Sequence, residues 1–214
     1  TVGDRVKIIK DVGLASISLF GALMAILIGT GLVYKEIEKR TIFTLLSKPL
    51  RRHEFLLGKF LGLVLTLAVL LAAMSLIFLA LVFLHTGTIE GRLLLAVLYI
   101  FFELVLITAV AILFSSFSTP ILSSLFALAF YLIGHFSWSL ETLLKKIPAG
   151  AGRTFLLFVY ALLPDLENFN IKSEVVHGLP VAAAHLLASA AYGLVYTAFI
   201  LVLAVVVFRR RDFV

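Results

Sequence analysis

Residues Phe60–Leu84 read FLGLVLTLAVLLAAMSLIFLALVFL and contain no charged side chain. A helix needs about 20 predominantly apolar residues to cross the hydrocarbon core of a bilayer, and this run is long enough. A strand of an outer-membrane barrel would alternate in hydrophobicity over about ten residues, and this run shows no such alternation. The stretch therefore predicts a transmembrane helix.

The composition of the whole chain agrees with that prediction. Of its 214 residues, 62% are hydrophobic and 14% are charged, whereas a soluble domain is about 45–50% apolar and about 25% charged. The mean hydropathy is +1.16, which leaves too little polar surface to enclose a water-facing core. A soluble enzyme and a disordered chain are therefore excluded. Because the sequence has no cysteine, disulfides, iron–sulfur clusters and thiolate zinc sites are excluded as well.

Four further stretches are long and apolar enough to be spans: Val12–Val33, Leu93–Phe117, Pro120–Leu140 and Pro180–Phe208. Pro120 is expected in the first turn of its helix, where its missing N–H does no harm. The predicted fold class is therefore all-α, a polytopic membrane helix bundle with five visible spans.

The distribution of basic residues predicts the orientation, because Lys and Arg favour the cytoplasmic side of a membrane. Seven of the 18 basic residues lie in Tyr34–Lys59, and three more form Arg209–Arg211. The net charge of +6 is accordingly explained by charges flanking the spans, and no nucleic-acid partner is expected. Five spans then place Thr1–Asp11 outside without a signal peptide. We therefore expect a further helix upstream in the natural protein, giving six spans with both ends cytoplasmic.

The loop Tyr34–Lys59 reads YKEIEKRTIFTLLSKPLRRHEFLLGK and is dense in charges of both signs. Four of its residues fall on one helical face: Ile42, Leu45, Leu46 and Pro49. Proline disfavours helical geometry in the residue before it, so a short helix should end near Lys48. The loop could lie on anionic headgroups as an amphipathic segment, or it could dock a cytoplasmic partner. The pairing charges would then be Glu36, Glu38, Lys39 and Arg40.

The run GTGLVYKEIEKRTIFTLLSKPLRRHEFLLGKFLG resembles the signature of type-2 ABC (ATP-binding-cassette) transporter permeases. The shared pattern is a glycine-rich span end, an acidic-basic cluster, a short helix with threonine, a Leu-Leu-Ser-x-Pro turn and a Gly-Lys at the start of the next helix. The residues that carry it are Gly29, Glu36, Glu38, Thr41, Leu45, Leu46, Ser47, Pro49, Arg52, Gly58 and Lys59.

The resemblance implies a single permease domain over residues 1–214, with a coupling loop at 34–59 and the first span missing. Such permeases place re-entrant or interfacial helices before the last span, which suits the external segment Glu141–Leu179. The residues expected to contact an ATPase subunit are Glu36, Glu38, Arg40, Thr41, Leu45, Ser47 and Pro49.

The family further implies which partners the chain has. Two copies of a cytoplasmic ABC ATPase subunit and a second permease copy or paralogue are expected, together with membrane lipids. The chain has no G-x-x-x-x-G-K-[ST] phosphate loop, so ATP and Mg²⁺ would bind the ATPase subunit and no cofactor would bind this chain. The resemblance implies an exporter of unknown substrate in a prokaryotic inner membrane, with a cytoplasmic C-terminus.

Glu103 is the one carboxylate inside a predicted span. A charge at that depth costs about 2.5–3.5 kcal/mol on insertion scales and usually faces the bundle interior or water. It is either part of a substrate path or an interhelix contact that fixes packing. His135 and His185 are lone histidines in apolar runs, so packing is a better interpretation than a metal site.

Two other functions remain open. An intramembrane enzyme would need Glu103 and His135 to face each other at one depth, and we expect them to be offset, because His135 lies toward the outer end of its predicted span. A secondary transporter or channel subunit is the other alternative, although no internal repeat of the kind common in secondary transporters is visible.

Small residues recur at four-residue steps, which lets helices approach closely. Three such series are present: Gly21, Ala25 and Gly29; Gly58 and Gly62; and Ser189, Gly193 and Thr197. They predict helix packing within the chain or contact with a second copy.

Overall fold

The computed structural model describes residues 2–38, 52–88, 90–136, 150, 152–154, 157 and 164–209. Every regular element named in these ranges is helical, which confirms the all-α bundle. The elements are α1 (Val2–Glu38), α3 (Arg52–Thr86), α4 (Gly91–Ser115), α5 (Pro120–His135), η1 (Leu166–Phe169), α8 (Lys172–Val176) and α9 (Ala183–Arg209).

Four of the described helices, α1, α3, α4 and α9, are long and apolar enough to cross a membrane. Helix α5 is apolar but has only 16 residues, or about 24 Å at 1.5 Å per residue, against a hydrocarbon core of about 30 Å. It covers the predicted span Pro120–Leu140 as far as His135, and residues 137–140 lie outside the described ranges. Pro120 occupies the first turn, as predicted, after Thr119 in extended conformation.

The helix limits differ from the apolar runs at several ends. Helix α1 begins at Val2 and α3 at Arg52, so both include charged residues that flank the predicted spans. Helix α9 begins at Ala183, three residues after Pro180. The helices thus extend beyond the apolar runs into charged turns, where Lys and Arg side chains reach water while their stems cover apolar groups.

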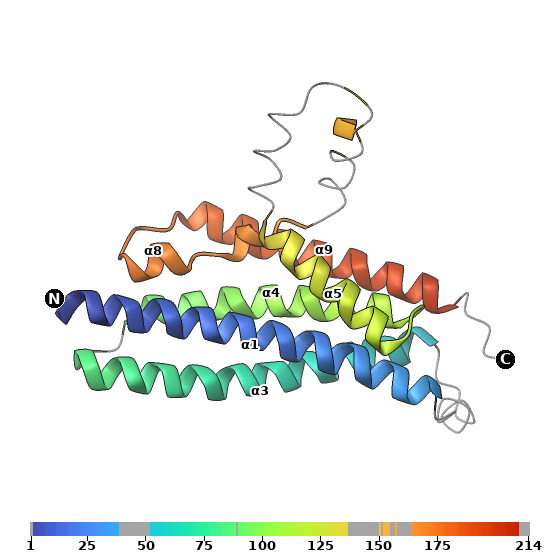
Figure 1. The fold of residues 1–214 in the computed structure, drawn as a ribbon, viewed down its shortest axis with the longest axis horizontal. Coiled ribbons are helices and arrows are strands. Elements are labelled where there is room, and N and C mark those ends of the chain that lie inside the picture. Colours follow the sequence, from blue (N-terminus) through green and yellow to red (C-terminus); the bar gives the residue numbers. More distant parts are fainter. Residues whose placement is uncertain are drawn as a thin grey trace.

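Helix α4 is the central element of the bundle. It packs on α1, α9, α3 and α5, and every side chain from Leu106 to Ile112 is fully buried. The other long helices lie around it (Figure 1). Many of their leucine, valine and phenylalanine side chains are exposed on the outside of the bundle.

Helices α1 and α3 are antiparallel, so the end of α1 and the start of α3 lie together (Figure 1). The turn between α4 and α5 and the end of α9 lie at this same end of the bundle. We call it the coupling end, because it carries the flanks of the segment for which docking was predicted.

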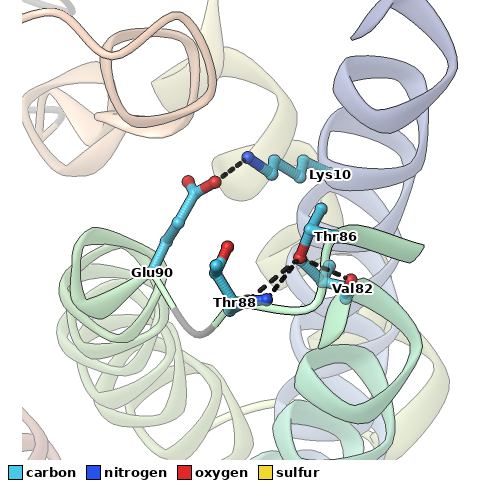
Figure 2. A network of polar contacts seen from close by, with 5 residues as sticks. All are labelled: Lys10, Val82, Thr86, Thr88 and Glu90. Carbon is cyan, nitrogen blue, oxygen red and sulfur yellow. Dashed lines mark hydrogen bonds and ion pairs between the residues drawn. The ribbon is translucent and has the colours of Figure 1, made fainter. Parts of the chain in front are cut away.

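A short polar network closes the opposite end (Figure 2). Lys10 of α1 forms an ion pair with Glu90, the residue just before α4. Beside it, the Thr86 hydroxyl donates to the Val82 carbonyl at 2.9 Å and accepts from the Thr88 N–H at 3.3 Å. These contacts fix the link between α3 and α4 against the first turns of α1.

The end of the segment that was predicted to be external packs against the bundle before α9. Leu166 and Phe169 of η1 and Val175 of α8 are at most 2% exposed, and η1 and α8 contact α1, α4 and α5. This part of the predicted segment Glu141–Leu179 is therefore built into the helix bundle.

Candidate functional site

The segment predicted to dock an ATPase begins in the last turns of α1. The backbone of Glu36 and Glu38 is helical there, and their side chains lie outside the described part of the structure. Five further predicted coupling residues lie outside the described ranges altogether: Arg40, Thr41, Leu45, Ser47 and Pro49. The structure places the two helix ends that flank them at the same end of the bundle, the coupling end (Figure 1).

The start of α3 is packed against the end of α9. The ring of Phe55 stacks on that of Phe208, with centroids 6.3 Å apart and an interplanar angle of 17°. Phe208 and Leu56 are each 2% exposed, and the Lys59 ammonium lies 5.9 Å from the centroid of the Phe55 ring. A displacement of the start of α3 would therefore be passed directly to α9.

A second candidate site lies in the middle of the bundle, at Glu103. Its side chain is fully buried on α4, and its Oε1 atom lies 3.5 Å from Nε2 of His135, the last residue of α5. The expectation that these two side chains are offset is therefore wrong. It assumed that α5 crosses the membrane completely. Because α5 starts beside the end of α4 and runs back for only 16 residues, its last residue reaches the middle of α4.

His135 belongs to a polar stripe on α5. Tyr131 precedes it by four residues, the spacing of neighbours on one helical face, and the two rings lie 4.5 Å apart. Tyr131 in turn interacts electrostatically with Glu103 and lies beside Ser18 of α1. The stripe thus joins α1, α4 and α5. The spacing of Tyr131 and His135 was the signal in the sequence that could have revealed it.

Two glycines allow η1 to approach α5 and α9 closely. A Cβ atom at Gly134 of α5 would lie 2.7 Å from Leu166, and one at Gly193 of α9 would lie 2.8 Å from the ring of Phe169. The Asp165 N–H, just before η1, also donates to the hydroxyl of Tyr192 at 3.0 Å. Helix η1 is therefore packed between α5 and α9. Its contact on α5 is Gly134, the residue directly before His135.

The packing of η1 and α8 against the bundle also brings charged residues toward the Glu103–His135 pair. Lys172, the first residue of α8, and Glu167 of η1 interact electrostatically with both members of the pair. Asp165 interacts with His135 as well. None of these three was singled out from the sequence as a neighbour of Glu103, because they lie more than sixty positions away from it along the chain.

Several residues that were predicted to pack helices together are buried or lie close to another helix of the same chain. A Cβ atom added at Gly21 would lie 2.7 Å from the Leu104 side chain, and one added at Gly29 would lie 2.9 Å from the Cβ of Ala111. Ala25 and Ser189 are 1% and 3% exposed. At two other glycines of the predicted series, Gly58 and Gly62, an added Cβ atom would meet nothing within 4 Å.

The described part of the structure contains no cluster of side chains suited to binding a metal ion. No group of three or more His, Asp or Glu side chains is close enough there to hold an ion. His185 lies on α9 with its Nε2 atom 3.5 Å from the Ser189 hydroxyl.

Comparison with known families accounts for this architecture. The model for the family described as "ABC-2 family transporter protein" matches residues 4–213. The chain belongs to this family. None of the curated proteins matches the sequence significantly.

Membership of the ABC-2 family confirms the resemblance seen in the loop after the first predicted span. The chain is an ABC transporter permease and a multi-pass membrane protein. The bilayer is therefore the solvent for the apolar side chains on the outside of the bundle, such as Leu65, Leu76 and Val195, which are 67%, 71% and 71% exposed.

Proposed function

We propose that this chain is the membrane-spanning subunit of an ATP-driven exporter and couples ATP hydrolysis on a separate cytoplasmic ATPase subunit to substrate movement. The observation that carries the proposal is the family match over residues 4–213. Two copies of the ATPase would dock at the coupling end of two permease chains, either identical or paralogous. ATP and Mg²⁺ would bind the ATPase, this chain would hold no cofactor, and it would catalyse no reaction itself.

Basic residues support the assignment of sides. The coupling end carries the charged segment between α1 and α3 and the arginines at residues 209–211, and Lys and Arg favour the cytoplasm. The coupling end and the C-terminus would therefore face the cytoplasm of a prokaryotic cell, with η1 and α8 in the outer half of the inner membrane.

Contacts at the coupling end suggest how movement would pass into the spans. Closure of two ATPases on ATP would displace the docked segment as a rigid body. Its flanks are the end of α1, which packs along α4, and the start of α3, which stacks on α9 through Phe55 and Phe208. Four long helices, α1, α3, α4 and α9, would thus receive the movement without a further connecting element.

The test is to co-express the full-length natural chain with its candidate ATPase, purify the complex in detergent and measure ATP hydrolysis. Reversal of charge at Glu36→Lys and Glu38→Lys should release the ATPase or uncouple its activity. Asp11→Lys is the matched control, because Asp11 is an exposed acidic residue on the same helix at the opposite end.

If the charge reversals at Glu36 and Glu38 change neither ATPase binding nor ATP hydrolysis, and thus give the same result as Asp11→Lys, the proposed coupling role of this segment is wrong. If no ATPase co-purifies at all, the ATP-driven mechanism is wrong.

The alternative of an intramembrane enzyme gains one observation, the 3.5 Å contact between Glu103 and His135. An enzyme site must also admit a substrate, and the Glu103 side chain is fully buried. Transport accounts for the family and for the coupling end, so it remains the proposal.

A further inference from the structure

The carboxyl group of Glu103 is unusual in its surroundings. The side chain is 0% exposed, and neither oxygen has a hydrogen-bond partner of good geometry among the described residues. An ionised carboxylate in a low-dielectric interior carries a large desolvation penalty unless it is paired or protonated. Nε2 of His135 lies 3.5 Å from its Oε1 atom.

The other nitrogen of His135 decides the protonation of this pair. Nδ1 lies 3.3 Å from the backbone carbonyl of Tyr131. A carbonyl oxygen only accepts hydrogen bonds, so Nδ1 carries a proton. In a neutral imidazole with that tautomer, Nε2 has a lone pair, and Nε2 is the atom that lies 3.5 Å from Oε1 of Glu103.

A lone pair on Nε2 and an ionised carboxylate would repel each other at 3.5 Å, and one further proton on either group removes that repulsion. Either Glu103 is neutral, or the imidazole is protonated and forms an ion pair with the carboxylate. In both forms the pair holds one exchangeable proton beyond that on Nδ1, and its net charge is zero. The two forms differ only in which atom the proton is bonded to.

Charged groups of both signs lie around the pair. Lys172 interacts with both members and is cationic, and Tyr131 of the α5 stripe is neutral. Glu167 and Asp165 are acidic and lie on the η1 side. Ser18 of α1 has no charge to offer. A second proton would give the buried pair a net positive charge facing Lys172, since imidazolium and a neutral carboxyl group would then coexist.

The position of His135 is tied to η1 through its neighbour Gly134, which packs on Leu166 and lies near the Pro164 carbonyl. Separation of α5 from α4 would therefore disturb η1, and with it α8. We propose that Glu103 and His135 form an intramembrane binding site for a single proton, and that a second proton drives α5 from α4 and loosens the η1–α8 segment. This site does not depend on the proposed ATPase partner.

The absence of cysteine from the sequence allows a clean test. Val175→Cys places one thiol on the buried face of α8, because Val175 is 2% exposed. Val82→Cys on α3 is the matched control, since Val82 is also 2% exposed. The full chain in lipid nanodiscs is reacted with a water-soluble maleimide between pH 7.5 and pH 5. Each rate is divided by that of the same variant unfolded in detergent at the same pH, which removes the effect of thiol ionisation.

The normalised rate at Val175→Cys should rise as the pH falls, by at most about tenfold per pH unit, because one proton is linked to the opening. The rate at Val82→Cys should stay constant. No rise at Val175→Cys, or an equal rise at both positions, overturns the proposal.

Two substitutions identify the group that takes up the second proton. His135→Gln leaves no imidazole to charge and should make the rate at Val175→Cys independent of pH. Glu103→Gln preserves His135 and should retain one titration step. A full response in His135→Gln would assign it to Glu167, Asp165 or another group and overturn the proposal.

If His135→Gln does not fold, the wild-type chain labelled with ¹⁵N at its five histidines supplies the test by NMR. One imidazole must carry a proton on Nδ1 that exchanges slowly with solvent, and must titrate together with the labelling response. Five imidazoles that all exchange as exposed groups would contradict the site.

Discussion

Helices α3 and α4 are the two most apolar spans, yet they occupy opposite environments. The mean hydropathy of their most apolar windows is 3.0 and 2.7, and the buried share of those windows is 28% and 61%. The more hydrophobic helix is thus the more exposed one. Lipid tails are as apolar as leucine, so hydropathy does not separate a lipid-facing helix from a central one.

Polar side chains distinguish these helices better than hydropathy does. The hydroxyls of Thr66 and Ser75 on α3 donate to carbonyls one turn earlier in the same helix. On α4 the Thr108 hydroxyl does the same, but this helix also directs polar groups to other elements, with Glu103 toward α5 and Tyr99 toward α9. In this permease, tertiary polar contacts mark the centre of the bundle.

The comparison predicts first that equal truncations have unequal costs. Leu104→Ala on α4 removes a side chain that is 0% exposed, whereas Leu65→Ala on α3 removes one that is 67% exposed. The first should lower the free energy of unfolding by about 2–5 kcal/mol through the cavity it leaves. The second should change it by about 0.5 kcal/mol or less, because lipid fills the space. Unfolding in mixed micelles with increasing SDS measures both, and equal losses would contradict the central position of α4.

The glycines allow the same comparison by addition of volume. Gly29→Val on α1 would place a Cβ 2.9 Å from that of Ala111 on α4, while Gly62→Val on α3 meets nothing within 4 Å. Overpacking should cost about 1–3 kcal/mol at Gly29, and Gly62→Val should cost much less, although the change in helix propensity is the same. Thermal unfolding followed by size-exclusion chromatography compares the two. A greater loss at Gly62 would indicate that α3 packs on a partner through this glycine.

The ion pair between Lys10 and Glu90 attaches the first turn of α4 to α1. The two side chains are 7% and 38% exposed, so Glu90→Gln leaves a nearly buried ammonium without its partner and should cost about 1–3 kcal/mol. Adding Lys10→Met should recover part of that loss, because the unpaired charge is removed. A double-mutant cycle measures the coupling, with Asp11→Asn as the exposed control. A coupling of zero would mean that the pair does not hold α4.

The smallest effect is expected for single hydroxyls. Tyr99→Phe removes the hydrogen bond to the Leu186 carbonyl of α9 and should cost about 0.5–1.5 kcal/mol. Thr66→Val removes a bond within one turn of α3, whose acceptor keeps its helical partner, so almost no change is expected. Thermal unfolding of both variants in one detergent decides whether tertiary hydroxyl bonds are the stronger ones.

Much of the fold was predictable because the bilayer imposes length and composition on each span. The runs at Val12–Val33, Phe60–Leu84, Leu93–Phe117 and Pro180–Phe208 each correspond to a long helix. The loop motif after the first of them identified the family correctly. The residues for which ATPase docking is proposed, from Glu36 to Pro49, still await a direct test.

The meeting of Glu103 and His135 was decided by tertiary structure. Periodicity places both residues on helices, but it does not state where a helix ends inside the membrane. Helix α5 stops at His135, and η1 enters beside Gly134, so the histidine reaches the depth of Glu103. The sequence by itself determined that the chain is a helical membrane bundle of the ABC-2 family, because apolar length and a local motif are properties of neighbouring residues. Only the tertiary structure decided which helix is central and which charges meet, because those depend on contacts between residues far apart in the chain.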